Sequence, residues 1–373
     1  MLPYGRQSID QSDIDAVTAV LSGDWLTTGP QVTAFEADLA AVTGAACTVV
    51  SNGTAALHTA YAAAGIGPGD VVLMPPMTFV ATAATAIARG ATVRFCDIDP
   101  RTATIDPNAA AALVDDATRA VVCVDYAGHP GDYDRLREVT DAHDVTLVSD
   151  AAHAIGSLYK GRPVGSLADL TTFSFFPTKN LTTAEGGAVA ALDASHHTRA
   201  QRFRTHGLIR DPRQLRDSDE GGWHQEVAEL GLNYRLPDVL CALGRSQLSR
   251  LDSFKARRAR LFERYGVGLA GLPGVGLPAR HGDVDPLWHL YAIRVHDGRR
   301  REVYERMRAA GIGVQVNYLP VYWHPVFADA GYRRGLCPEA EAFYGEQLSL
   351  PLYADLGDAD QDRVIETLWT ILG

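Results

Sequence analysis

The feature that most constrains the fold is the alternation of short apolar runs with helical stretches in the first 150 residues. The runs are CTVVS, VVLM, TVRFC, AVVCVD and TLVSD. Strands separated by helices need crossover connections, so the pattern predicts an α/β fold with a mostly parallel sheet. The runs show little polar alternation, which indicates strands buried on both faces. Ahead of them, Ser12 is expected to cap a helix that continues through Leu21.

The spacing changes after the last of these runs. Strand-like TTFSFF and GGAVAA flank the segment PTKNLTTAE, and the polar residues 211–222 are expected to form a mobile loop. Arg and Leu recur at helical spacing from Leu248 to Leu269, which predicts a long connecting helix, and strand-like LYAIRV follows it. We expect an N-terminal arm and a large domain over residues 1–245, and a smaller α+β domain over residues 246–373.

Charge and cysteine usage limit the classes of partner. Lys and Arg total 34 against 45 Asp and Glu, for a net charge of −11, which disfavours broad binding to nucleic-acid phosphates. A few local cations can still bind a small anion. The five cysteines include no C-x-x-C pair, which argues against zinc or redox chemistry and for a reducing compartment.

Two further observations bear on membranes and export. The longest uncharged run, residues 71–88, contains Pro75 and Pro76, so it predicts strand, turn and helix rather than a membrane span. The start MLPYGRQSID lacks the apolar segment of a secretory signal. We therefore expect a cytoplasmic protein that binds neither membrane nor nucleic acid.

The segment SNGTAAL follows the strand-like CTVV and opens a helix. Backbone N–H groups at a helix start bind phosphate, Gly53 permits close approach, and the Thr54 hydroxyl adds a donor. Asn-Gly is also an ordinary turn dipeptide and Thr an ordinary cap, so the segment by itself leaves both interpretations open.

Two other groups stand where an α/β sheet places its ligands, near the carboxyl ends of strands. Asp150 ends TLVSD, with His153 three residues later; the carboxylate could instead cap a helix, and the histidine could be an ordinary buried one. Lys179 lies in FSFFPTKNLTTAEGGAV. A lysine among aromatics usually extends to solvent, but a desolvated lysine has a lowered pKa and can form a Schiff base.

One ligand would use all three features. Pyridoxal phosphate (PLP) needs an anchored phosphate, an acid beside its pyridine nitrogen and an amine for its aldehyde. The sequence therefore predicts a PLP enzyme. A nicotinamide dehydrogenase is poorly supported, because GIGPGD at residues 65–70 lacks the G-x-G-x-x-G spacing and precedes a strand.

An ordered set of motifs carries a family resemblance through nearly the whole chain: SNGTAAL, PPMTFVAT, VDYAG, SDAAHAIGS, FSFFPTKNLTTAEGGAV, the His-Gly pair at 206–207, GLNYRLPD and QVNYLPVYWHP. Together they resemble the DegT/DnrJ/EryC1/StrS family of sugar aminotransferases. The sequence looks most similar to the branch that makes UDP-4-amino-4,6-dideoxy-N-acetyl-altrosamine for pseudaminic acid. The resemblance implies fold type I and a homodimer with active sites at the subunit interface.

The resemblance also implies roles for individual residues. Lys179 would bind the cofactor and then act as the general base, and Asp150 would pair with the pyridinium nitrogen. His153 would lie near the ring hydroxyl, and Phe79 would stack on the ring rather than fill the core. The phosphate ligands would be Gly53, Thr54, Ser174 and, from the neighbouring subunit, Asn233.

Other residues would line the sugar-nucleotide side. Arg235 would meet a diphosphate through its bidentate donors, although it could equally form a surface ion pair. Thr28, Gly29, Tyr318 and His324 complete this set.

The expected activity is ping-pong transfer of an amino group from L-glutamate, or from glutamine, to a nucleotide-linked keto-sugar. The lysine stands where the family's dehydrating branch carries histidine, which favours transamination. Phe176 replaces the more usual histidine, and TTAEGG replaces the common TTGEGG. The alternatives are an acceptor that is a keto-cyclitol or an antibiotic deoxysugar, and a non-catalytic PLP-binding regulatory protein.

Overall fold

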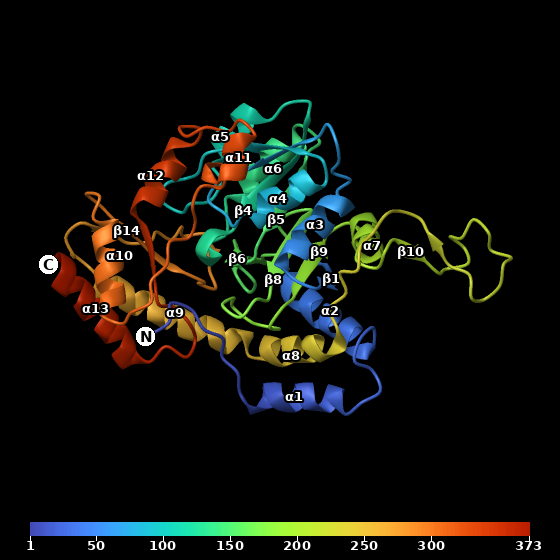
Figure 1. Ribbon diagram of the computed structural model, residues 1–373, viewed down its shortest axis with the longest axis horizontal. Coiled ribbons are helices and arrows are strands. Elements are labelled where there is room, and N and C mark those ends of the chain that lie inside the picture. The colour runs from blue at the N-terminus through green and yellow to red at the C-terminus, as the bar shows by residue number, and fades with distance from the viewer.

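A seven-stranded sheet organises the large part of the molecule. The computed structural model describes all residues, 1–373, and Figure 1 shows the arrangement of its elements. The strand order is β1-β9-β8-β5-β4-β2-β3, and only β9 runs antiparallel to its neighbours. The mostly parallel sheet predicted from the sequence is confirmed. The strands are β1 (Ala46–Val50), β2 (Val71–Met74), β3 (Thr92–Phe95), β4 (Thr118–Val124), β5 (Thr146–Asp150), β8 (Leu170–Ser174) and β9 (Gly187–Ala191).

The sheet is covered on both faces, which explains why its strands read as apolar runs. Successive residues of one strand belong to different hydrophobic cores: Leu147 packs in one and Val148 in the other. Because side chains alternate across a strand, both must be apolar when both faces are covered. The covering helices are α2 (Pro30–Thr43), α3 (Gly53–Ala63), α4 (Ala81–Ala88), α5 (Pro107–Leu113), α6 (Tyr133–Asp141) and α7 (Ala194–Phe203). A 3₁₀ turn, η1 (Tyr126–Gly128), lies between β4 and α6.

A second, smaller sheet is built from the C-terminal third of the chain. It contains β12 (Val275–Gly276), β14 (Tyr291–Val295) and β15 (Gln347–Leu350), and a third hydrophobic core lies between it and the helices around it. The long helix predicted from Leu248 to Leu269 is confirmed as α9 (Leu251–Gly268), and a further helix, α8 (Asp238–Ser249), ends just before it, the two meeting at Arg250. The remaining helical elements are α10 (Arg300–Ala309), η2 (Val321–Trp323), α11 (Pro325–Asp329), α12 (Pro338–Glu346) and α13 (Asp358–Leu372).

A hairpin arm, residues 205–233, projects from the body beyond α7 (Figure 1). It is closed at its base by the pair Thr205 and Asn233, and its strands are β10 (Leu208–Ile209) and β11 (Glu226–Val227). The polar residues 211–222 form the turns at its tip. Three further short strands, β6 (Leu158–Tyr159), β7 (Arg162–Pro163) and β13 (Val284–Asp285), form a separate small sheet.

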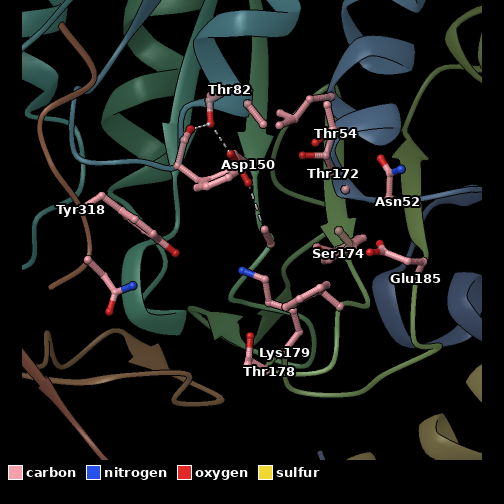
Figure 2. Close-up of a pocket in the computed structure, with 18 of the residues that line it drawn as sticks. Asn52, Thr54, Thr82, Asp150, Thr172, Ser174, Thr178, Lys179, Glu185 and Tyr318 are labelled. Atoms are coloured by element: carbon pink, nitrogen blue, oxygen red, sulfur yellow. Dashed lines mark hydrogen bonds between the residues drawn. The ribbon is translucent and has the colours of Figure 1, made fainter. Parts of the chain in front are cut away.

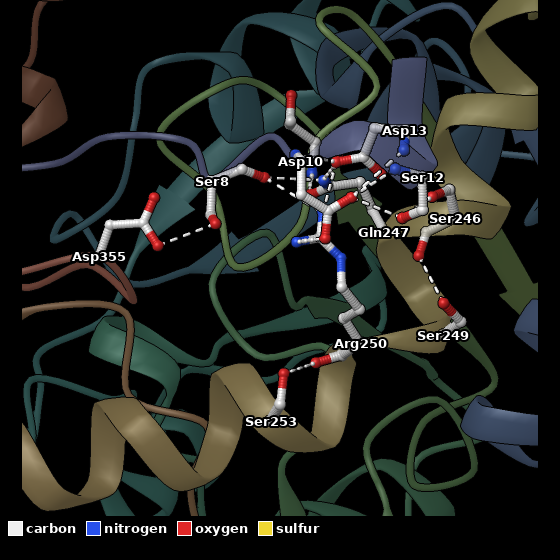
Figure 3. Close-up of polar contacts among 11 residues, drawn as sticks. Ser8, Asp10, Ser12, Asp13, Ser246, Gln247, Ser249, Arg250, Ser253 and Asp355 are labelled. Carbon is white, nitrogen blue, oxygen red and sulfur yellow. Dashed lines mark hydrogen bonds and ion pairs between the residues drawn. The ribbon is translucent and has the colours of Figure 1, made fainter. Parts of the chain in front are cut away.

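The N-terminal arm joins the two halves of the molecule. Leu2 pairs with Ile312, and both residues belong to the core under the sheet of β12, β14 and β15. The Ser8 hydroxyl donates to Asp355 over 2.9 Å. Downstream, Asp13 at the start of α1 (Gln11–Leu21) accepts hydrogen bonds from Gln247 of α8 and from Arg250 (Figure 3). The arm is therefore fixed at both ends.

The prediction that Ser12 caps α1 is wrong. The N-cap is Asp10, whose carboxylate accepts from the backbone N–H of Ser12 and Asp13, while the Asp13 carboxylate accepts from the N–H of Asp10. This reciprocal pair is a capping box, with Asp in place of the usual Ser and Glu.

No helix of the structure combines the length and the apolarity that crossing a bilayer requires.

Candidate active site

The carboxylate of Asp150 stands at the carboxyl end of the central strand β5 and is almost completely buried. The Thr82 hydroxyl of α4 donates to its Oδ2 over 2.6 Å, and the Ala152 N–H donates to its Oδ1 over 3.2 Å. Thr78 in turn lies 2.7 Å from the Thr82 hydroxyl. Burial raises the pKa of Asp150, while these hydrogen bonds oppose the rise. The structure thus holds a desolvated carboxylate in a fixed orientation.

Lys179 lies opposite this carboxylate, on the loop that connects β8 to β9 (Figure 2). Its own backbone N–H donates to the Phe176 carbonyl over 2.8 Å, which closes a turn under the lysine. Burial lowers the pKa of Lys179 from 10.5 to about 8, and the negative charge of Asp150 opposes the change. The side chain is therefore a far better nucleophile near neutral pH than an exposed lysine.

The start of α3 forms a cradle between these two groups and β8. Asn52 caps the helix by accepting from the Ala55 N–H over 2.8 Å, and the first N–H groups of the helix have no partner within it. A Cβ on Gly53 would lie 2.8 Å from the Cβ of Ser174, so only glycine lets the helix start approach β8 this closely. The same tight junction recurs at Gly187, whose added Cβ would lie 2.6 Å from the Asn52 carbonyl oxygen.

These groups surround one cavity of about 490 Å³, drawn in Figure 2. This is within the size range of small-molecule sites. Seven of the residues singled out from the sequence line it: Gly53, Thr54, Phe79, Asp150, Ser174, Lys179 and Tyr318. The cavity therefore contains a desolvated carboxylate, an amine of lowered pKa and a helix start that suits an anion.

His153 lies behind this lining rather than in it. Its Nε2 is 3.1 Å from the Tyr318 hydroxyl, and its Nδ1 accepts from the Ala127 N–H over 3.3 Å. Burial keeps the pKa of His153 well below its usual range. His153 is therefore connected to the cavity only through its hydrogen bond with Tyr318.

The other residues named from the sequence lie outside the cavity lining of this chain. Asn233 ends the hairpin arm, and Arg235 follows it. The Gly29 N–H donates to Asp238 over 2.7 Å, beside Thr28 in the loop before α2. His324 stands at the start of α11. The structure of one chain therefore does not bring these five residues to the cofactor end of the cavity.

Several lining residues were not predicted. Thr82 belongs to PPMTFVAT, where a hydroxyl one helical turn after Thr78 was a readable signal. Most of the others lie within motifs quoted above but were not singled out there, whereas Tyr4 of the N-terminal arm belongs to no family motif. This group comprises Tyr4, Asn52, Leu57, Ala81, Thr82, Ala152, Thr172, Phe173, Phe176, Thr178, Glu185, Gln315 and Asn317.

Comparison with known proteins gives concordant matches. Residues 7–369 match the model of the DegT/DnrJ/EryC1/StrS aminotransferase family. The spore coat polysaccharide biosynthesis protein SpsC of Bacillus subtilis (strain 168) is 39% identical over 378 residues, which covers 100% of this chain and 97% of that protein.

Solved structures match over the same length. Helicobacter pylori PseC, an aminotransferase involved in the biosynthesis of pseudoaminic acid, superposes with a TM-score of 0.93 at 29% identity, covering 100% of this chain and 99% of that one. Spr1654 of Streptococcus pneumoniae, described provisionally as a sugar aminotransferase, superposes in its PLP form with a TM-score of 0.92 at 30% identity, covering 99% and 98%.

Proposed function

Because this chain belongs to the DegT/DnrJ/EryC1/StrS aminotransferase family, we propose that it transfers the amino group of L-glutamate to a nucleotide-linked 4-keto-6-deoxy hexose. The family, fold type I and dependence on PLP, predicted from the sequence, are confirmed by the comparisons. The chain is a sugar aminotransferase. The amino donor, the identity of the acceptor and the roles of individual residues are the content of the proposal.

The observation that carries the proposal is the opposition of Asp150 and Lys179 across a cavity that also contains the helix start at Gly53. These residues fit PLP on three counts: a buried carboxylate suits a pyridinium nitrogen, an amine of lowered pKa suits an aldehyde, and unpartnered helix N–H groups suit a phosphate. Gly53 itself puts no side chain into the cradle, where a Cβ would lie 2.8 Å from that of Ser174.

The bound cofactor supplies an electron sink for the bonds broken during amino transfer. The residues of the chain do the rest. Asp150, oriented by Thr82, keeps a proton on the pyridine nitrogen, and Lys179 removes and returns protons at its Nζ in both half-reactions. The Phe79 ring, exposed into the cavity, provides a face for stacking.

The acceptor side of the proposal rests on the aromatic wall of the cavity. Phe176 is about half exposed and lines it, whereas Phe79 is assigned to the cofactor. An aromatic face contacts the methyl group of a 6-deoxy sugar without leaving a hydroxyl unpaired. This supports a deoxy sugar over an acceptor that is hydroxylated at every carbon, such as a keto-cyclitol.

We further propose a homodimer in which the hairpin arm serves the neighbouring site. Large apolar side chains are exposed on the arm and on the loop before α2, with Leu230 90% and Trp223 82% exposed, and Trp25 and Leu26 about half exposed. Exposed apolar patches mark interaction surfaces. Asn233, at the base of the arm and outside its own cavity, would then reach the phosphate of the partner.

The five cysteines are all free and buried, which supports a cytoplasmic location.

The test is a two-stage assay with purified protein loaded with PLP. L-glutamate and L-glutamine are added in turn, and loss of the yellow cofactor absorption is followed. Nucleotide-linked 4-keto-6-deoxy hexoses, their 6-hydroxy counterparts and a keto-cyclitol are then offered, and products are identified by mass spectrometry. We expect bleaching by glutamate and amination of the deoxy sugars at the highest kcat/KM. Preferred amination of the cyclitol, or no amination of any acceptor, would contradict the proposal.

A further inference from the structure

The wall of the cavity opposite the phosphate cradle is formed by Tyr318. In Figure 2, Asn52, Thr54 and Ser174 gather on one side of the cavity, Tyr318 lies on the other, and Asp150 and Lys179 face each other between them. In pyridoxal phosphate the nitrogen is opposite the carbon that carries the aldehyde, and the phosphate arm and the ring hydroxyl flank that carbon on opposite sides. With the nitrogen at Asp150, the aldehyde at Lys179 and the phosphate at the cradle, the ring hydroxyl faces Tyr318.

The direction of the hydrogen bond between His153 and Tyr318 follows from the partner of the other ring nitrogen. The Ala127 N–H points at the His153 Nδ1 over 3.3 Å, so this nitrogen is the acceptor and carries no proton. The neutral ring must then carry its proton on Nε2, which donates to the Tyr318 oxygen over 3.1 Å. The tyrosine oxygen accepts here, and its own proton is left for a different partner.

The loop that sets this tautomer is fixed from several sides. Ala127 has a positive φ of 60°, and its carbonyl accepts from the His289 N–H over 2.8 Å. The His289 ring packs against that of His153 with 4.2 Å between centroids. On the other side, the Tyr126 hydroxyl donates to the Asn317 carbonyl over 2.6 Å and so fixes the residue before Tyr318. Tyrosine and histidine are therefore held as a pair.

We propose that Tyr318 is the hydrogen-bond donor to the ring hydroxyl oxygen of the bound cofactor, and that the Ala127 N–H and His153 position its proton toward that oxygen. The Tyr318 hydroxyl is paired with His153, and Tyr318 lines the cavity. This assignment moves Tyr318 from the sugar side, where the resemblance placed it, to the cofactor side. It depends on PLP and not on the sugar acceptor, so the two proposals can fail separately.

Other ionisable groups face this pair and enter any titration of it. They are Asp150 at the end of β5, Lys179 on the β8–β9 loop, His289 before β14, Tyr126 after β4 and Tyr4 of the N-terminal arm. Burial lowers the pKa of His289 as well as that of His153, so both stacked rings are neutral. Neither ring competes with Lys179 as a cation.

The test is the pH titration of the visible absorption of the PLP-loaded protein, without substrates. A donor to the ring oxygen stabilises its anion, so Tyr318→Phe should raise the midpoint of the absorption change by about one pH unit, a tenfold change in proton affinity. Tyr344→Phe, in the small domain and outside the cavity lining, is the matched control and should leave the midpoint unchanged. An unchanged midpoint in Tyr318→Phe with cofactor bound would overturn the proposal.

A second measurement is made on the protein with Tyr318 intact, so it does not depend on whether Tyr318→Phe binds the cofactor. Nitrogen-15 NMR of histidine-labelled, cofactor-free protein reports which ring nitrogen of His153 carries the proton, and the signal lost in His153→Gln identifies the residue. We expect the proton on Nε2. A proton on Nδ1 would break the link from Ala127 to Tyr318 and would also refute the proposal.

Discussion

The cavity and the hairpin arm both depart from the usual placement of side chains, but in opposite ways. Around the cavity, polar groups are buried and paired, as for Asp150 with Thr82 and Ala152. On the arm, apolar groups such as Trp223 and Leu230 lie in solvent. A buried charge needs partners and an exposed apolar group needs a cover. The cavity therefore contains most of its chemistry within one chain, whereas the arm, in the proposed dimer, acts on a second chain.

The largest expected effect falls on the cavity alone. Lys179→Ala removes the amine that binds the cofactor and moves protons, and should lower turnover by at least about 10³-fold. The measurement is amination rate, together with mass spectrometry after borohydride trapping. The unaltered chain should carry the adduct on Lys179, and the variant should carry none. An active variant, or an adduct on another lysine, would contradict the assignment.

The next effect falls on the arm alone. Trp223→Ser combined with Leu230→Ser should weaken self-association by about 100-fold or more, since both large anchors are lost from each of two symmetric copies. Light scattering over a dilution series measures this. Val267→Ser, which removes an equally exposed side chain from α9, should leave association unchanged. If the double variant associates as the parent does, the arm is not the dimer surface.

Gly53→Ala distinguishes the cradle from the rest of the cavity. Its Cβ would lie 2.8 Å from that of Ser174, so the helix start must move away from β8, and PLP affinity should fall by about 10- to 100-fold, or 1.4–2.8 kcal/mol. Gly67→Ala is the matched control, because a Cβ there meets no atom within 4 Å. Equal PLP affinity in the two variants would show that the helix start at Gly53 does not bind the cofactor.

The buried lysine should also couple stability to pH. The pKa of Lys179 is about 8 in the folded chain against 10.5 for the free side chain. Between these values the unfolded chain binds more protons, so the free energy of unfolding of the cofactor-free protein should rise with pH, by about 1–3 kcal/mol from pH 8 to 10.5. Denaturant titrations compare it with Lys179→Met, which should lose this rise. An identical pH dependence in the two proteins would show that Lys179 is not desolvated.

The smallest effect concerns a local strain beside the site. Ala184 has a positive φ of 65°. Ala184→Gly should stabilise the chain by about 0.5–1 kcal/mol, because glycine adopts this conformation without a Cβ clash. Thermal unfolding measures it, and Ala309→Gly in α10, where φ is helical, should instead destabilise by a similar amount. A destabilised Ala184→Gly would mean that the methyl group makes a contact worth more than the strain.

The sequence predicted what strands and local motifs determine. The apolar runs led to the sheet, and Asp150 and Lys179 could be found because a strand end and a loop between strands are readable in one dimension. Tyr4 of the N-terminal arm could not, since it meets the cavity only through tertiary packing across the two halves of the molecule. Ser12 was misread as a cap because two aspartates in the same turn satisfy the helix start better.

Most of the predicted residues that lie outside the cavity stand beside exposed apolar side chains. Asn233 and Arg235 follow the hairpin arm, and Thr28 and Gly29 lie in the loop that also exposes Trp25 and Leu26. In the proposed dimer a second copy completes this surface, so one chain alone does not bring these residues to a cavity. The proposed dimer therefore carries both the phosphate role of Asn233 and the sugar-side roles of the others, and the arm variant above tests them together.

The way the N-terminal arm is fastened has a consequence for biosynthesis. Its first residues pair beside Ile312 and hydrogen-bond near Asp355, and it carries Tyr4 into the cavity between these two points. During translation the N-terminal segment emerges first, yet its docking partners emerge last. A ribosome-bound nascent chain can assemble the large sheet before this wall exists, so the cavity acquires its complete lining only when synthesis is nearly finished.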